Sequence, residues 1–204
     1  LDRTKEPGSA GEPLYLDVVK AFYNKEDAPC IVGGRFGLGS KDPLPNDIAA
    51  VYDNLAQENP KDGFTIGIVD DVTNTSLRPL DDIDITPTGI TSCKFWGLGS
   101  DGTVGANKSA IKIIGDHTDM YAQGYFEYDS RKSGGITLSY LRFGKNIIRS
   151  RYPIARADFI ACHNQSYVYK YDVIKGLKKN GVFLLNTIWT PEELDNRLPA
   201  SLKR

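Results

Sequence analysis

The apolar residues of the chain fall into two patterns that alternate along it. Short continuous apolar runs at 31–36 and 64–69 are typical of buried strands, and the apolar residues of 48–55 recur at the spacing of one helix face. A short amphipathic helix is also predicted at 14–23. Two buried strands joined by a helix normally run parallel through a right-handed crossover, so this part of the chain predicts a parallel strand–helix–strand unit.

The second part of the chain repeats this order. A strand is predicted at 91–96, a helix at 104–114 and an alternating strand at 121–128. Further predicted elements are strands at 136–143, 158–162 and 182–186, a helix at 167–178, and a helix that begins after Thr190. The sequence therefore predicts an α/β fold of two consecutive strand–helix–strand units with mainly parallel sheets, the second of them Rossmann-like.

The stretch between positions 70 and 89 separates the two units. It is rich in aspartate and proline and has few periodic apolar positions, which is typical of a domain boundary. We place the boundary near residue 86, so the predicted domains cover 1–85 and 86–204. The chain starts without Met, and no closing strand or helix is predicted near its C-terminus, so we expect both ends to be cut.

Composition narrows the function classes. Lys and Arg total 25 against 26 Asp and Glu, and no basic block is present, so duplex nucleic acid is an unlikely partner on charge grounds. No apolar run is long enough for a membrane span or a signal peptide, which favours a cytoplasmic protein. The cysteines at 30, 93 and 162 form no C-x-x-C motif, and the two histidines lack suitable neighbours, so no metal site is expected.

The strongest motif is Gly97-Leu98-Gly99-Ser100-Asp101-Gly102, a G-x-G-x-x-G sequence between a predicted strand and a predicted helix. Glycines at these positions let the backbone approach a pyrophosphate, while the free N–H groups of the following helix face the anion. Thr103 follows the last glycine instead of lysine, so the loop is not a Walker A motif. The alternative is that the glycines only form a tight strand-to-helix turn.

A second loop, Ser130-Arg131-Lys132-Ser133-Gly134-Gly135, follows the strand predicted at 121–128. Its cations and hydroxyls suit an extra phosphate on an adenosine ribose, as in NADP or coenzyme A. A solvated hairpin loop with surface cations is equally compatible with this sequence. His163-Asn164 comes directly after another predicted strand, at the edge where open α/β sheets bind ligands. These patterns leave NADP and coenzyme A undecided.

Segments 95–108, 125–135 and 141–144, which include these loops, closely resemble pyruvate:ferredoxin (flavodoxin) oxidoreductase. The resemblance also covers Asp70-Asp71-Val72-Thr73 and Ala161-Cys162-His163-Asn164, and extends from about residue 14 to the C-terminus. It implies that 1–85 is the C-terminal part of a transketolase C-terminal-like domain. It also implies that 86–204 is most of a gamma-type catalytic domain, truncated at its C-terminus.

The resemblance implies an enzyme, a 2-oxoacid:ferredoxin oxidoreductase, of which this chain is one part. In that family a long chain oxidatively decarboxylates pyruvate on thiamine diphosphate, passes electrons through [4Fe-4S] clusters to ferredoxin or flavodoxin, and transfers the acetyl group to coenzyme A. The thiamine-binding and cluster-binding parts are expected outside these 204 residues, so the isolated chain is expected to be inactive. The implied partners are the remaining domains, ferredoxin or flavodoxin bound through those domains, and a second copy in a homodimer.

The resemblance favours coenzyme A over NADP as the ligand of this segment, with no catalytic residue supplied by it. The implied cofactor-binding residues are Gly97, Gly99, Ser100, Asp101, Gly102, Thr103, Val104, Gly105, Asn107, Lys108, Lys132 and Asn164. The loop from Gly99 to Gly105 would contact the phosphates with Lys108 nearby, and Lys132 would meet the ribose 3′-phosphate. Two alternatives stay open: a non-catalytic domain that braces the thiamine domains, and an NADP-dependent oxidoreductase.

Overall fold

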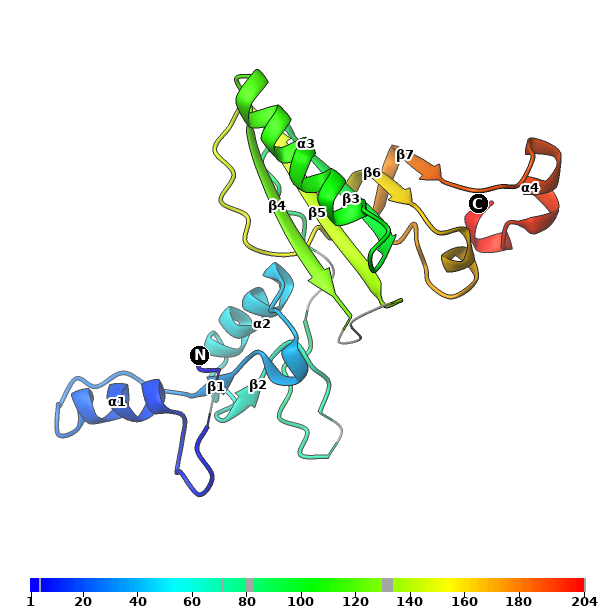
Figure 1. Cartoon of the computed structure of the whole chain (residues 1–204). Helices are drawn as coiled ribbons and strands as arrows, with labels where there is room; N and C mark the ends of the chain where they lie inside the picture. Colours follow the sequence, from blue (N-terminus) through cyan, green and yellow to red (C-terminus); the bar gives the residue numbers. More distant parts are fainter. Residues whose placement is uncertain (4, 71, 80–82, 130–133, 204) are drawn as a thin grey trace. The chain divides into compact units, whose positions relative to one another are not determined.

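The computed structural model divides into two compact units, Leu1–Ile85 and Thr86–Arg204, each with its own sheet (Figure 1). The residues described are 1–3, 5–70, 72–79, 83–129 and 134–203. The first unit has a two-stranded sheet and the second a five-stranded sheet. Both units combine strands with helices, as the α/β pattern predicted.

The first unit keeps the predicted strand–helix–strand order with much shorter strands. Its elements are α1 (Pro13–Phe22), β1 (Gly34–Arg35), a 3-10 turn (Leu38–Ser40), α2 (Pro45–Leu55) and β2 (Phe64–Thr65). The two strands pair in parallel, with Gly34 opposite Phe64. A Cβ on Gly34 would collide with the Phe64 ring, so glycine is what lets this ring pack against the strand. Phe64 joins Val51 and Ile66 in a small core.

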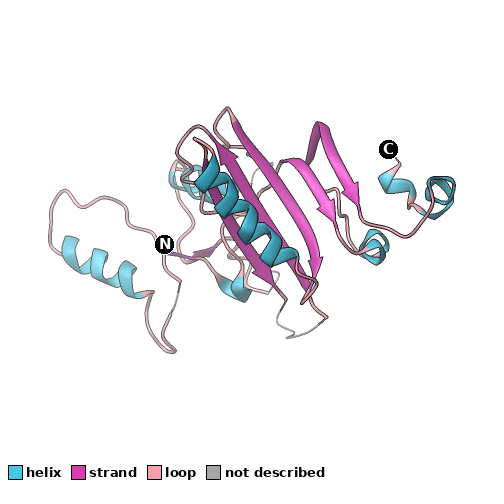
Figure 2. Ribbon diagram, turned by 45° about the horizontal axis from the view of Figure 1, so that its top comes forward, coloured by secondary structure: helices cyan, strands magenta, loops and turns pink. Residues whose placement is uncertain are grey.

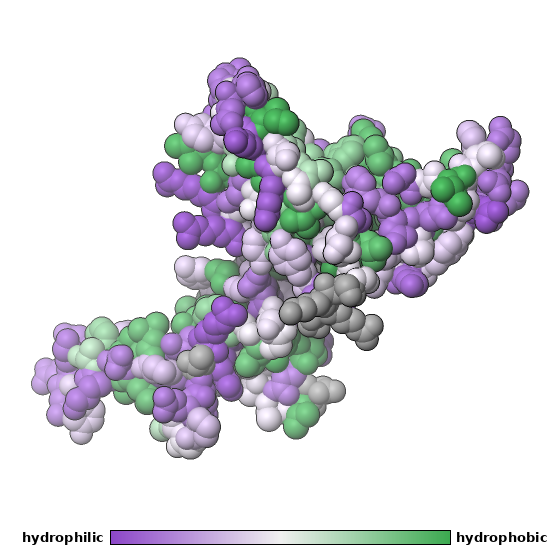
Figure 3. Space-filling model, viewed as in Figure 1, coloured by the Kyte–Doolittle hydropathy of each residue, from purple (hydrophilic) through white to green (hydrophobic). Residues whose placement is uncertain are grey.

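Helix α1 contributes little to that core. None of its residues is buried, although Leu14, Leu16 and Phe22 are apolar. Figure 3 shows hydrophobic and hydrophilic surface mixed over this segment. The first unit therefore leaves apolar side chains of α1 in contact with solvent.

The second unit consists of a five-stranded sheet with one long helix. Its elements are β3 (Ile90–Leu98), α3 (Thr103–His117), β4 (Tyr121–Tyr128), β5 (Ile136–Gly144), β6 (Ala157–Cys162), a 3-10 helix (Gln165–Tyr169), β7 (Leu177–Leu185), α4 (Pro191–Arg197) and a 3-10 turn (Ala200–Leu202). The strand order is β4-β5-β3-β6-β7. The β3, α3 and β4 elements lie within one or a few residues of their predicted positions.

The prediction of a mainly parallel, Rossmann-like sheet is wrong for this unit. Strand β6 pairs in parallel with β3 and with β7, but β5 is antiparallel to both β3 and β4. Strands β3 and β4 thus run parallel without touching, because β5 returns between them and takes the hydrogen bonds of both. The result is a mixed sheet in which the β3–α3–β4 crossover is split by an inserted strand.

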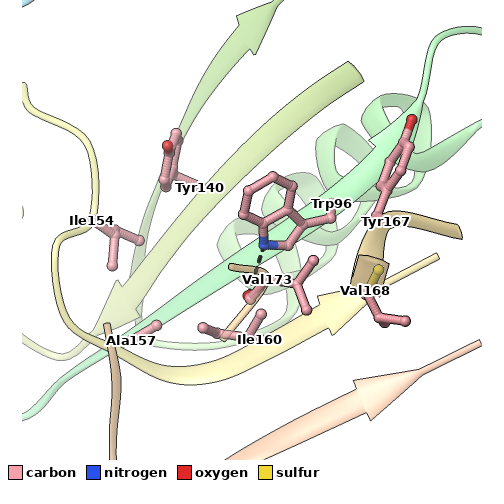
Figure 4. Packing of buried hydrophobic residues seen from close by; sticks show 9 residues of the cluster. Trp96, Tyr140, Ile154, Ala157, Ile160, Tyr167, Val168 and Val173 are labelled. Atoms are coloured by element: carbon pink, nitrogen blue, oxygen red, sulfur yellow. Dashed lines mark hydrogen bonds between the residues drawn. The ribbon is translucent and has the colours of Figure 1, made fainter. Parts of the chain in front are cut away.

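The two faces of the sheet are covered differently. Helix α3 lies across one face (Figure 2), where it comes so close to β4 that a Cβ on Gly124 would collide with Ile111. The opposite face carries the main core, in which Trp96 packs among Ile160 and Val173 and its Nε1 donates a hydrogen bond to the Val173 carbonyl at 3.0 Å (Figure 4). Strand β3 is therefore held on both faces just before the glycine-rich loop.

The prediction of a helix at 167–178 is also wrong. Only a short 3-10 helix, Gln165–Tyr169, forms, and β7 already begins at Leu177. Gly176 lies between them at a φ of 83°, a left-handed conformation that ends helical geometry and suits glycine. The helix start after Thr190 is confirmed, because Thr190 and Glu193 form a reciprocal capping box at the start of α4.

Candidate functional site

A pocket of about 430 Å³ lies at the carboxyl end of β3. It is enclosed by the glycine-rich loop, the first turn of α3, the end of β4 and the start of β5. Its described lining residues are Leu98, Gly99, Ser100, Asp101, Gly102, Val104, Gly105, Tyr128, Asp129, Gly135, Ile136 and Thr137. The volume is within the range of small-molecule sites, which usually measure about 300–1,000 Å³.

The carboxylate of Asp101 holds the glycine-rich loop together through two hydrogen bonds from backbone N–H groups. Its Oδ2 accepts a hydrogen bond from the Leu98 N–H at 2.7 Å, and its Oδ1 accepts one from the Thr103 N–H at 2.8 Å. Burial acts to raise the pKa of this carboxyl, but the hydrogen bonds from Thr103 and Leu98 and the charge of His163 outweigh it, so the pKa lies below its ordinary value. Asp101 is therefore ionised at neutral pH and already occupies the first N–H of helix α3.

Other backbone N–H groups of the first turn of α3 remain open. Among the described residues, no hydrogen-bond acceptor lies on the N–H of Val104 or Gly105, as expected for a helix start. The N–H of Gly99 is not available, because it donates to the Gly135 carbonyl at 2.7 Å. An anion in this pocket would thus meet the N–H groups of α3, while those of Leu98, Gly99 and Thr103 serve the loop itself.

Gly97 has a packing role beneath the pocket. A Cβ on Gly97 would stand 2.7 Å from both the Cβ of Thr103 and the Oγ1 of Thr137. The glycine therefore makes room for two threonine side chains where α3 starts above the sheet. Close packing of helix on strand explains this glycine without any contact to a ligand.

Thr103, Asn107, Lys108 and Asn164, which the sequence also named, lie outside the lining. The Nδ2 of Asn107, which is buried, donates to the Thr103 carbonyl at 2.9 Å. The Nζ of Lys108 lies 5.5 Å from the centre of the Phe126 ring, over strand β4. Asn164 caps the following 3-10 helix, since its Oδ1 accepts from the Ser166 N–H and Oγ. Lys132 falls outside the described residues.

The structure therefore brings together only part of the predicted set. The predicted residues that share the pocket are Gly99, Ser100, Asp101, Gly102, Val104 and Gly105. The lining residues outside that predicted set are Leu98, Tyr128, Asp129, Gly135, Ile136 and Thr137, of which Leu98 and Gly135 belong to the two loops that the sequence singled out. Five of these six lie at the ends of β4 and β5 or directly next to them. Of the other four, only Thr137 could have been noticed from the sequence, because its hydroxyl stands between two apolar residues at the start of a predicted strand.

The described residues of the lining carry negative charge. Asp101 and Asp129 contribute carboxylates, and the described part of the lining includes no cation. The cations Arg131 and Lys132 belong to the segment that joins Asp129 to Gly134 and lie outside the described residues. Within the described lining, the partial positive charge at the start of α3 is what could offset the charge of an anionic ligand.

The described residues do not fit a metal or iron–sulfur site. No group of three His, Cys, Asp or Glu side chains within the described ranges could hold a metal ion. Cys30 is exposed in the first unit, while Cys93 and Cys162 are buried in the second, and burial raises the pKa of the Cys93 thiol to about 11. A [4Fe-4S] cluster takes four thiolates, more than the three cysteines of the chain. In the part of the chain described, no helix is both long and apolar enough to cross a bilayer.

The fold and the pocket define a mixed α/β domain with a pocket at a glycine-rich loop. Comparison with known proteins gives its family: the chain belongs to the pyruvate ferredoxin/flavodoxin oxidoreductase family, which it matches over residues 92–203. This bears out the resemblance drawn from the glycine-rich loop and its neighbours.

Individual relatives match the chain over its whole length. The pyruvate-flavodoxin oxidoreductase of Enterobacter agglomerans is 66% identical over 205 residues, which cover 100% of this chain and 18% of that protein. The pyruvate:ferredoxin oxidoreductase of Moorella thermoacetica is 62% identical over 204 residues, which cover 100% of this chain and 17% of that protein. The chain thus spans less than a fifth of the length of these relatives.

Proposed function

We propose that this chain is a segment of a pyruvate:ferredoxin or pyruvate:flavodoxin oxidoreductase and contributes the surface that binds coenzyme A. The observation that carries the proposal is the 66% identity to a pyruvate-flavodoxin oxidoreductase along the entire chain. The complete enzyme would oxidatively decarboxylate pyruvate in the cytoplasm, reduce ferredoxin or flavodoxin, and deliver the acetyl group to coenzyme A. The segment itself supplies no catalytic group in this proposal.

The pocket supports coenzyme A as the ligand. It combines open N–H groups at the start of α3 with a hollow of about 430 Å³, which accommodates part of a molecule as long as coenzyme A. The phosphates would face the N–H groups of Val104 and Gly105, and the cations of 130–133 would offset the two carboxylates of the lining. In this arrangement Lys132 pairs with the ribose 3′-phosphate.

The remaining cofactors and partners belong to other segments. Thiamine diphosphate and the [4Fe-4S] clusters supply decarboxylation and electron transfer in the proposed enzyme, and the described residues fit neither cluster nor metal. Residues 1–85 would end the transketolase C-terminal-like domain, and 86–204 would form most of the gamma-type domain. Ferredoxin or flavodoxin would bind elsewhere, and the complete enzyme would be a homodimer.

Two observations favour a second function, a domain that only braces the thiamine-binding domains. The carboxylate of Asp101 already occupies the first N–H of α3, and packing alone accounts for Gly97. Under this reading the glycine-rich loop is a structural turn. Substitutions in the pocket would then change stability without any effect on coenzyme A.

A segment exchange tests the proposal. The matching 18% of the Enterobacter agglomerans enzyme is replaced by this chain, and pyruvate-dependent flavodoxin reduction is measured against coenzyme A concentration. We expect an active chimera with a saturable dependence on coenzyme A. In parallel, the 204-residue chain, shown to be folded by circular dichroism, is titrated calorimetrically with coenzyme A, 3′-dephospho-coenzyme A and NADPH.

The titration separates the candidates. Binding of coenzyme A that weakens without the 3′-phosphate supports the proposed role of this segment. Binding of NADPH alone would overturn the choice of coenzyme A. A folded chain that binds none of the three, in an active chimera, would favour the bracing function.

A further inference from the structure

Helix α3 covers only part of its face of the five-stranded sheet. It contacts β4, β5 and β3, and in the part of the chain that the structure describes no helix lies over β6 and β7 on this face (Figure 2). The connection from β6 to β7 does not cover it either, because Val168 and Val173 of that connection pack with Trp96 in the main core on the opposite face. Among the described residues, the β6–β7 part of the α3 face therefore has no second layer.

Apolar side chains gather on this uncovered part of the sheet. Val182 of β7 pairs with Phe159 of β6, and Leu184 of β7 pairs with Ala161 of β6. Phe159 also contacts Phe95 of β3, with 5.8 Å between the ring centroids. Paired residues of neighbouring strands point to the same face, so these side chains form one surface. We call Phe95, Phe159, Val182 and Leu184 the apolar β7 face.

The strand register places the apolar β7 face on the same side of the sheet as α3. Phe95 pairs with Ser139 of β5, which pairs with Phe126 of β4. Gly124, two residues earlier in β4, points to the same face as Phe126, and it lies against Ile111 of α3. The apolar β7 face therefore continues the surface on which α3 packs.

The exposure of this face is unusual for its strands. Val182 is 57% exposed and Leu184 is 44% exposed, while Phe95 and Phe159 are partly exposed. A single exposed apolar residue is ordinary, but a contiguous apolar surface usually marks a place that another element covers. Strands β3, β6 and β7 run parallel to one another, and parallel strands occur almost only where both faces are covered.

The dimensions of the uncovered part suit one helix. Neighbouring strands lie about 4.8 Å apart, so β6 and β7 offer a width of about 10 Å, which matches the diameter of a helix with its side chains. A helix there would lie beside α3 at the usual distance of about 8–10 Å between packed helices. The layer that α3 begins would then extend across the whole sheet.

The length of the relatives supplies a candidate for this helix. The matched residues make up 18% of the Enterobacter agglomerans enzyme, so more than four-fifths of such a protein lies outside them. We infer that the apolar β7 face is an interface within the complete enzyme, covered by the apolar side of a helix from outside these 204 residues. The inference rests on the proposed place of this chain in a longer enzyme and not on the binding of coenzyme A.

Thiol labelling of the segment-exchanged enzyme tests this inference. Val182→Cys and Leu184→Cys each place a thiol on the apolar β7 face, and Lys179→Cys, at an exposed position of the same strand outside this face, is the matched control. We expect the thiols at 182 and 184 to react about 100-fold more slowly in the folded enzyme than in urea, because the covering helix must first open. The thiol at 179 should react at a similar rate in both. Mass spectrometry of the labelled peptides separates these thiols from the other cysteines of the enzyme.

A photoreactive benzoylphenylalanine in place of Leu184 identifies what covers the face. We expect a cross-link within one polypeptide, to a peptide outside the 204 residues whose apolar residues recur at helical spacing. A cross-link between two copies, or to another part of the 204 residues, would overturn the inference, as would rapid labelling at 182 and 184 in the folded enzyme. These results would leave the proposed coenzyme A function standing, whereas a folded enzyme without dependence on coenzyme A would contradict that function alone.

Discussion

The Oδ1 of Asp101 accepts a hydrogen bond from the backbone N–H of Thr103 at 2.8 Å, at the very start of helix α3. The other carboxylate oxygen holds the N–H of Leu98, so one side chain ties the end of β3 to the start of the helix. A negative charge at a helix N-terminus is favourable because it meets the positive end of the helix dipole. The glycine-rich loop is therefore stabilised by a charge of its own before any ligand arrives.

This relationship predicts a pH-dependent effect of Asp101→Asn. The folded chain holds the pKa of Asp101 below its ordinary value of about 3.9, so the ionised carboxylate stabilises the fold above that pH and the contribution is lost as the pH falls through the lower folded pKa. We expect the variant to lose about 1 kcal/mol of unfolding free energy at pH 7 and less at pH 3. Urea unfolding at both pH values measures this, and an equal loss at both would contradict the role of the charge.

The packing around Gly97 predicts a large effect from one added methyl group. In Gly97→Ala the new Cβ would stand 2.7 Å from atoms of Thr103 and Thr137, so we expect a loss of about 1–3 kcal/mol of unfolding free energy. Gly115→Ala is the matched control, because a Cβ there meets nothing within 4 Å and alanine favours the interior of α3. Denaturant unfolding should show the first variant destabilised and the second unchanged or more stable.

The local pattern of apolar residues was sufficient to predict most helices and strands of the second unit, but not which strands pair with each other. The alternation at 121–128 and the helical spacing at 104–114 are properties of each segment, and β4 and α3 form where these patterns lie. The pairing of β5 between β3 and β4 depends on contacts between distant segments, which no local pattern encodes. The apolar patterns of the individual strands therefore could not distinguish a mixed sheet from a parallel one.

For the pocket as well, the sequence predicted the local part and not the part that depends on the pairing of strands. The spacing of glycines identified the loop that forms one wall of the pocket, because backbone conformation is a local property. The opposite wall comes from the ends of β4 and β5 and could not be assigned without the strand order. Thr137 illustrates the limit, since threonine is common in strands and only the folded structure places this one at the pocket.

A substitution at Gly105 allows ligand affinity and helix stability to be measured separately. A Cβ on Gly105 meets nothing within 4 Å, and Gly105 lines the pocket in the first turn of α3. Gly105→Ala should therefore keep or raise the stability of the helix while it places a methyl group at the wall of the pocket. We expect coenzyme A affinity to fall several-fold in calorimetric titration. Gly115→Ala, at the other end of the same helix, should leave that affinity unchanged.

The proposed contact of Lys132 with the 3′-phosphate predicts a selective loss. In the segment-exchanged enzyme, Lys132→Ala should raise the KM for coenzyme A about tenfold, since a charge-assisted hydrogen bond to phosphate is lost. The KM for 3′-dephospho-coenzyme A should not change, because that ligand lacks the group that Lys132 meets. Lys112→Ala, an exposed lysine of α3 outside the pocket lining, controls for the general loss of positive charge. Equal increases for both ligands would show that Lys132 acts on some other part of coenzyme A, and no increase for either would remove it from the site.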